Sequence, residues 1–189
     1  SVSGSELYTQ AKKFGDVVTV DHKISLSKQD QGVQGEKALI VMLDVATRWM
    51  EAYPVKTKDA EQVCFSLQDF CRPRRVGGTM YSDNAPELLR AAKKHAWVGE
   101  TSVPGRPSRN GLIERRVRIV LEGARAQLLQ AGFSPGWRPH AVKCYGAMRN
   151  LVKDGVSPYT RRFHKEFVGH LIPFGALVDF TQTPVKKDK

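Results

Sequence analysis

The sequence predicts an α/β fold, in which helices cover the faces of a mixed five-stranded β-sheet. Three observations support this prediction. A continuous apolar run over residues 38–44 is typical of a strand that is buried on both faces. Helical spacing of apolar residues follows over 58–71 and again over 110–130. Short β-branched or aromatic stretches, bounded by Gly and Pro, indicate further strands. The chain has 189 residues, which is enough for one domain with a sizeable core.

Each element has its own signal in the sequence. Strands are marked by β-branched, aromatic or continuous apolar residues, and helices by one apolar stripe. Cys64 and Cys71 fall two turns apart on one helix face and are expected in the core. We expect strands at 17–20 (ending at Asp21), 38–44, 50–55, 79–81 and within 97–103, and helices at 58–71, 86–95, 110–130 and 135–151.

Composition divides the chain into four parts. Residues 1–13 are a polar lead-in, and 14–153 contain the predicted sheet and helices. Residues 154–182 form a small C-terminal extension, in which 177–180 could be a strand. Residues 183–189 are a polar tail that is expected to be disordered.

The chain is strongly basic. It has 30 Lys and Arg against 19 Asp and Glu, a formal charge of +11, which favours a polyanionic partner. Charge alone does not separate nucleic acid from an anionic membrane surface. No apolar stretch approaches the roughly 18 residues of a membrane span. Three cysteines without a Cys-x-x-Cys pair indicate a reduced, intracellular protein, and the histidines lack a zinc-ligand spacing.

Three acidic residues stand at the ends of predicted elements. Asp21 follows the first strand, Asp83 follows the strand at 79–81, and Glu114 lies in the first turn of the helix at 110–130. Separated carboxylates in such positions can converge on two divalent metal ions, which together stabilise the attacking and leaving oxygens of a phosphodiester. Each acid also has a plain structural interpretation, as a turn residue, a helix cap or a partner of the helix dipole. Only their combination points to one site.

The flanking residues resemble the catalytic core of retroviral and retrotransposon integrases, the Asp-Asp-Glu polynucleotidyl transferases with an RNase H-like fold. The resemblance covers roughly residues 14–180. The matching stretches are Val-Thr-Val-Asp at 18–21, Val-Met-Leu-Asp-Val-Ala-Thr-Arg-Trp at 41–49, Tyr-Ser-Asp-Asn at 81–84 and Arg-Pro-Ser-Arg-Asn-Gly-Leu-Ile-Glu-Arg at 106–115. Ser-Pro-Tyr at 157–159 and His-Leu-Ile-Pro-Phe-Gly at 170–175 resemble the tail of copia-type elements.

Two positions depart from the family pattern. The second and third acids are separated by 30 residues, where about thirty-five are usual. Ala85 stands where a Gly is usual after Ser-Asp-Asn. If that position required a positive φ, alanine would be strained there.

The resemblance implies 3′-end processing and strand transfer, which join the DNA ends of an element to target DNA. Asp21 and Asp83 would hold one metal ion, and Asp21 and Glu114 the other, with two Mg²⁺ per site or Mn²⁺ as a substitute. It also implies a homo-oligomer that acts in the nucleus. The residues expected to contact DNA are Asn84, Arg106, Arg109, Asn110, Arg115, Arg118 and Arg125.

Alternatives remain open at this level. The arginines could instead form a solvated face, paired with Glu114 and Glu122 at four-residue spacing. The chain could be a non-catalytic DNA-binding or assembly module derived from an integrase core, or an RNase H-like nuclease that cuts without joining. Among the other acids, Asp44 is assigned a structural role and Glu87 a surface or helix-dipole role. Glu122 lies too far along its helix to replace Glu114.

Overall fold

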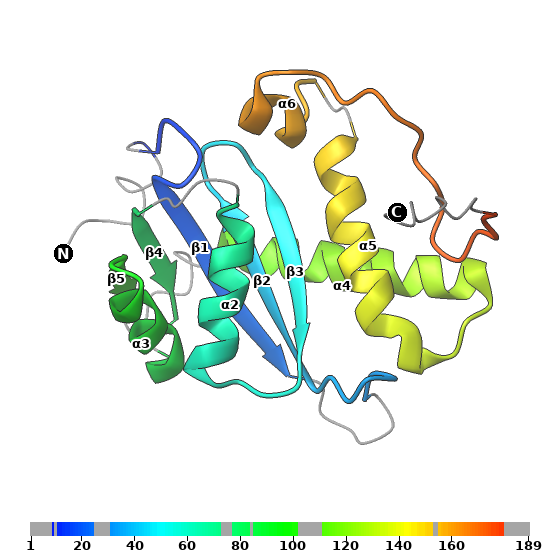
Figure 1. Ribbon diagram of the computed structural model, residues 1–189, viewed down its shortest axis with the longest axis horizontal. Coiled ribbons are helices and arrows are strands. Elements are labelled where there is room, and N and C mark those ends of the chain that lie inside the picture. Colours follow the sequence, from blue (N-terminus) through cyan, green and yellow to red (C-terminus); the bar gives the residue numbers. More distant parts are fainter. Residues whose placement is uncertain are drawn as a thin grey trace, which may run out of the picture.

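A five-stranded mixed sheet forms the centre of the computed structural model, and helices cover both of its faces (Figure 1). The structure describes residues 9, 11–24, 31–72, 77–83, 85–101, 111–152 and 155–179. The strands follow the spatial order β3-β2-β1-β4-β5. Strand β1 is antiparallel to β2, and β2 to β3, whereas β1, β4 and β5 are parallel neighbours. The predicted fold class is confirmed.

The elements lie close to their predicted positions. In chain order they are β1 (Val17–Ile24), β2 (Ala38–Asp44), β3 (Met50–Val55), α2 (Ala60–Phe70), β4 (Thr79–Ser82), α3 (Pro86–Lys94), β5 (Val98–Thr101), α4 (Gly111–Ala131), η3 (Pro135–Trp137), α5 (Arg138–Leu151) and α6 (Pro158–Phe163). The predicted helix at 135–151 is a 3-10 turn followed by α5. The predicted boundary at 153/154, the tail at 183–189 and most of the lead-in lie outside the described residues.

The two faces of the sheet carry separate apolar clusters. Helices α2 and α3 cover one face, where Ile40, Met42 and Phe70 are buried. Helices α4 and α5 cover the other face, where Leu39, Val41 and Ile113 are buried. Every residue of β2 is buried, with alternate side chains entering the two clusters, because β2 is covered on both sides.

Two sequence-based predictions of strands are wrong. The first strand does not end at Asp21 but continues to Ile24, because β2 pairs with it as far as the Ile24–Ala38 pair. Residues 177–179 do not form a strand, and Leu177 is 95% exposed, since no strand in the described part of the chain lies beside them to offer hydrogen bonds. The C-terminal extension instead contains the short helix α6, which begins at the cap Ser157, whose hydroxyl accepts a hydrogen bond from the Thr160 N–H.

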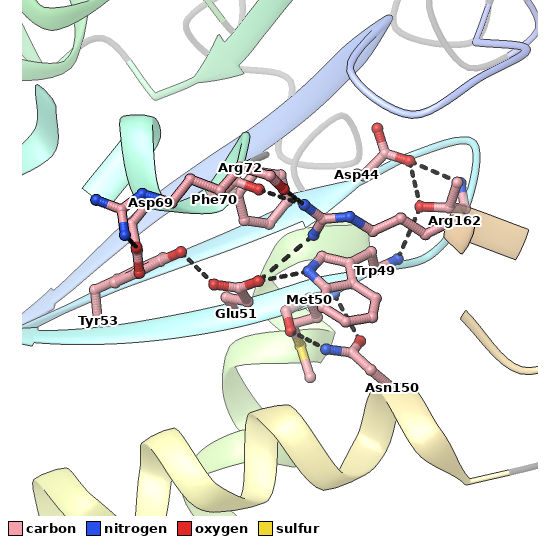
Figure 2. Close-up of polar contacts among 11 residues, drawn as sticks. Asp44, Trp49, Met50, Glu51, Tyr53, Asp69, Phe70, Arg72, Asn150 and Arg162 are labelled. Atoms are coloured by element: carbon pink, nitrogen blue, oxygen red, sulfur yellow. Dashed lines mark hydrogen bonds and ion pairs between the residues drawn. The ribbon is translucent and has the colours of Figure 1, made fainter. Parts of the chain in front are cut away.

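Asn150, at the end of α5, forms hydrogen bonds with the backbone of the edge strand β3. Its Nδ2 donates to the Met50 carbonyl over 2.7 Å, and its Oδ1 accepts from the Met50 N–H over 2.9 Å. Figure 2 shows this pair at the start of β3. Because β3 is an edge strand, the amide replaces the partner strand that Met50 lacks. Asn150 is 1% exposed, so water does not compete for these bonds.

Replacing Asn150 with leucine is expected to lower the free energy of unfolding by about 2–4 kcal/mol, since two buried backbone groups lose their partners. Urea unfolding followed by circular dichroism measures this change. Asn150→Asp keeps an acceptor for the Met50 N–H but offers no donor to the Met50 carbonyl, and is expected to be destabilised as well. A leucine variant within about 0.5 kcal/mol of the parent would contradict the assigned role.

Candidate active site

The register of β1 and β4 brings Asp21 and Asp83 next to each other. The two strands run parallel, and their last pair is Val20 with Ser82. Asp21 and Asp83 are the next residue on each chain, so neighbouring strands carry them to the same level of the sheet. Asp83 is exposed, and Asp21 is half-buried. The predicted position of Asp83, directly after its strand, is confirmed.

Side-chain alternation places Asp21 on the α4 side of the sheet. Asp21 pairs with Val41, and Val41 belongs to the cluster under α4 and α5. Residues that pair across neighbouring strands share a face. Asp83 follows the last residue of β4, Ser82, which pairs with Val20 of β1.

Glu114 lies in the first turn of α4, on the same side of the sheet. Ile113, the residue before it, is fully buried in the cluster that also contains Val41. Helix α4 packs against β1 and β2, and Glu114 itself is exposed. Asp21 and Glu114 therefore lie on the same side of the sheet, and Asp83 lies at the end of the strand next to β1.

The acids do not form a closed ligand set in the described part of the chain. No group of three His, Cys, Asp or Glu side chains there lies close enough together to hold a metal ion. The donors themselves suit Mg²⁺, which prefers carboxylate oxygens together with water. Asn84, Arg106, Arg109 and Asn110, four of the predicted DNA contacts, lie outside the described residues.

The backbone at Ala85 is unstrained. Its φ and ψ are −74° and 120°, in the extended region, and it precedes Pro86 at the start of α3. A positive φ is therefore absent at the position where the family usually has Gly, and alanine costs nothing there.

His22 lies on the opposite side of β1 from Asp21. Its Nδ1 is 3.4 Å from an oxygen of Glu87, and its side chain is only 2% exposed. Burial lowers the pKa of His22, and the positive charge of Lys58 acts in the same direction, while Glu87 and Asp83 oppose them. Glu87 does lie in the first turn of α3 as expected, but its side chain turns inward to His22. Sequence reasoning missed this pair, because His22 follows a residue already assigned to the end of the strand.

Arg115, Arg118 and Arg125 are exposed along α4. Among the described residues, no ion pair joins Glu114 or Glu122 to any of these arginines. The ion pairs at four-residue spacing that the alternative interpretation requires are therefore absent from the described part of α4. The guanidinium groups are available to an anionic partner. The apolar stripe of α4 is buried as predicted, with Val117, Val120, Ala124 and Leu128 in the core.

Asp44 is a buried acid with a structural role, as predicted. Its carboxylate accepts hydrogen bonds from the backbone N–H of Gly15 over 2.8 Å and from the N–H and hydroxyl of Thr47 over 2.7 and 2.6 Å. Burial raises the pKa of Asp44, and these hydrogen bonds oppose that shift. The carboxylate holds the β2–β3 turn against the segment before β1, which leaves it no part in the candidate site.

Arg162 of α6 joins the C-terminal extension to the sheet (Figure 2). Its guanidinium lies 3.9 Å from the centre of the Phe14 ring and 4.5 Å from that of Trp49. It donates to the Phe70 carbonyl over 2.9 Å and lies 3.5 Å from an oxygen of Glu51. No local sequence pattern marks this residue, since its partners are about ninety or more positions away.

Relatives with similar sequences are polyproteins of retroviruses and retrotransposons. The chain is 26% identical over 159 residues to the Gag-Pol polyprotein of woolly monkey sarcoma virus, which covers 80% of this chain and 9% of the polyprotein. It is 29% identical over 125 residues to the Pol polyprotein of transposon TNT 1-94 from Nicotiana tabacum, over 61% of this chain and 9% of that protein. The chain thus spans about a tenth of these relatives. No protein-family model matches it.

Among solved structures, the catalytic core domain of BIV integrase is similar, with a TM-score of 0.55 and 18% identity over 77% of this chain and 91% of that domain. The chain has the fold of a retroviral integrase catalytic core. The predicted RNase H-like sheet, and the resemblance to integrase cores on which it rested, are confirmed at the level of the fold and of homology to Pol polyproteins. In this integrase-like fold, none of the described helices is both long and apolar enough to cross a membrane.

Proposed function

We propose that the chain is the catalytic core of a retroelement integrase, which cuts and joins DNA by metal-assisted phosphoryl transfer. The observation that supports the proposal is the parallel register of β1 and β4, which brings Asp21 and Asp83 to the same level of the sheet, with Asp21 on the face that α4 covers. Glu114, in the first turn of α4, is the third acid of the proposed site. Homology to Pol polyproteins supports the same reaction class.

Each acid has a defined role in this proposal. By the resemblance, Asp21 and Asp83 would hold one metal ion, and Asp21 and Glu114 the other. When bound, Mg²⁺ or Mn²⁺ supplies stabilisation of the attacking and leaving oxygens of the phosphodiester. The carboxylates would bind and orient these ions and would form no covalent bond to DNA.

The exposed arginines of α4 would hold the DNA backbone beside the acids. Arg118 and Arg125 lie four and eleven residues after Glu114, near its face of the helix. Arginine contacts to phosphates position the duplex without reading its sequence. The resemblance to integrase cores also leads us to propose DNA contacts by Arg115 and by four residues outside the described part of the chain, Asn84, Arg106, Arg109 and Asn110.

The reaction has two steps. Water first attacks a phosphodiester near the end of the element's DNA, which breaks the bond to the 3′ oxygen and frees a 3′-hydroxyl. That hydroxyl then attacks a phosphodiester of the target DNA, so that one bond forms as another breaks. By the same resemblance, we propose that the chain acts as a homo-oligomer in the nucleus.

An assay with labelled DNA ends and a target duplex tests the function directly. The chain is expected to process and join the ends in Mg²⁺ or Mn²⁺ and to stop when EDTA is added. Asp83→Asn removes a ligand charge at an exposed position and is expected to lower the yield roughly 100-fold or more, since metal ions contribute several kcal/mol to such reactions.

The outcomes separate the candidate functions. Equal yields from the parent and from Asp83→Asn would overturn the proposed site. Cleavage without joining would favour a nuclease of the same fold. Salt-sensitive DNA binding without metal-dependent chemistry would favour a non-catalytic DNA-binding module.

A further inference from the structure

A basic pocket lies where the β2–β3 turn, α4, α5 and α6 meet. Its volume is about 160 Å³, and its lining includes four arginines, Arg48, Arg116, Arg149 and Arg161. A cavity of about 150 Å³ accommodates a molecule of the size of benzene, so the pocket has room for a small ligand. Figure 1 shows α6 above the end of α5, next to the β2–β3 turn.

The pocket is separate from the candidate active site. Arg116 follows Glu114 by two residues, so the two side chains point about 160° apart around α4. The β2–β3 turn, which carries Arg48, lies at the end of the sheet where β1 begins, whereas Asp21 lies further along β1. The pocket and the candidate metal site therefore share no residue.

The four arginines come from different elements, and their charges are not compensated. Within the described part of the chain, no carboxylate forms an ion pair with any of them. The Nε atoms of Arg116 and Arg149 are buried and have no hydrogen-bond partner there. Buried donors without partners are uncommon in folded proteins and indicate a missing acceptor.

Hydrogen bonds within the protein fix the backbone and the Asn150 amide that line the pocket. Asn150 and Met50 line it, and the amide of Asn150 is already bonded to the Met50 backbone. Arg48 has a φ of 64°, a left-handed conformation that is uncommon for a residue other than glycine. Its backbone N–H donates to the Asp44 carbonyl over 3.0 Å, so the tight turn is closed by a hydrogen bond. The turn presents the Arg48 side chain to the rim of the pocket.

We propose that this pocket binds closely spaced phosphate groups. Guanidinium forks match phosphate oxygens in pairs, and four of them around one cavity suit a ligand with several negative charges. The two sources of such groups are a free polyphosphate anion and the backbone of a nucleic acid. Either one supplies acceptors for the two buried Nε–H groups.

Isothermal titration with inorganic pyrophosphate, in EDTA to exclude metal chemistry, tests the pocket. The parent is expected to bind one pyrophosphate, and Arg116→Gln with Arg149→Gln to weaken binding roughly tenfold or more, as expected for lost hydrogen bonds to a charged group. The matched control is Lys93→Gln with Lys143→Gln, which removes two exposed charges outside the pocket. This control is expected to bind as the parent does.

A second pair of variants covers the case in which the buried substitutions prevent folding. Arg48→Gln with Arg161→Gln changes only exposed rim residues and is also expected to weaken pyrophosphate binding. A parallel titration with duplex DNA identifies the source of the phosphates. Loss of DNA affinity in the pocket variants but not in the lysine control, without pyrophosphate binding to the parent, would assign the pocket to nucleic acid. Equal losses in pocket and control variants, or no change in either titration, would overturn the proposal.

Discussion

Replacing Glu114 with glutamine is expected to reduce metal-dependent cutting and joining of DNA roughly 10³-fold or more. Glutamine keeps the shape of the side chain but removes the charge that a divalent ion requires, and metal ions contribute several kcal/mol to phosphoryl transfer. Glu114 is exposed at the start of α4, so the substitution leaves the core intact. Turnover of labelled DNA ends by the parent and by the variant measures the effect.

Glu122→Gln is the matched control for this experiment. Glu122 is also exposed on α4, but it lies eight residues, about 12 Å, further along the helix. The Glu122→Gln substitution removes the same charge from the same helix, but at a position outside the proposed metal site. We expect Glu122→Gln to keep most of the activity. An equal loss in both variants would indicate a general effect of charge on DNA binding and would refute the ligand role of Glu114.

Replacing Arg162 with methionine is expected to lower the free energy of unfolding by about 3–5 kcal/mol, the usual cost of removing one partner from a buried ion pair. The Arg162 side chain is 5% exposed, and that of its partner Glu51 is 26% exposed. Methionine can fill part of the space beside Phe14 and Trp49, but it cannot donate to the Phe70 carbonyl or compensate Glu51. Urea unfolding measures the loss.

Arg161→Met provides the control within the same helix. Arg161 is exposed, so its replacement is expected to change stability by no more than about 0.5 kcal/mol. A double variant that also replaces Glu51 with glutamine is expected to be less destabilised than the sum of the two single variants, since the uncompensated charge is gone. If Arg162→Met were as stable as Arg161→Met, the proposed stabilising role of Arg162 would be refuted.

The cost of losing Arg162 depends on pH. Burial raises the pKa of Glu51 above its ordinary value of 4.5, while hydrogen bonds from Tyr53 and Trp49 and the charge of Arg162 oppose this shift. A carboxyl with a raised pKa in the folded state contributes most stability below its unfolded pKa, and this contribution is lost as pH rises through the folded pKa. Without Arg162 the folded pKa of Glu51 rises further. The variant is therefore expected to be closest to the parent at acidic pH and furthest from it near neutral pH.

Much of the fold could be predicted because the signals are local. The apolar run in β2 follows from burial on both faces, and the stripe that contains Ile113 and Val117 follows from one buried helix face. The end of β1 was misplaced because polar residues continue the strand when a neighbouring strand supplies hydrogen bonds. The predicted strand at 177–180 is absent over its described residues, 177–179, for the opposite reason, since an apolar pattern forms no strand without a partner.

By itself, the sequence determined the family that the chain resembles and the three acids that the resemblance assigns to metal binding. This was possible because the motifs around Asp21, Asp83 and Glu114 are local patterns of residue type. Only the tertiary structure decided how these acids are arranged, because strand register sets Asp21 beside Asp83 and helix packing sets Glu114 on the same face. The same holds for Arg162 and for the pocket of four arginines. Their partners are distant in the chain, and only packing brings them together.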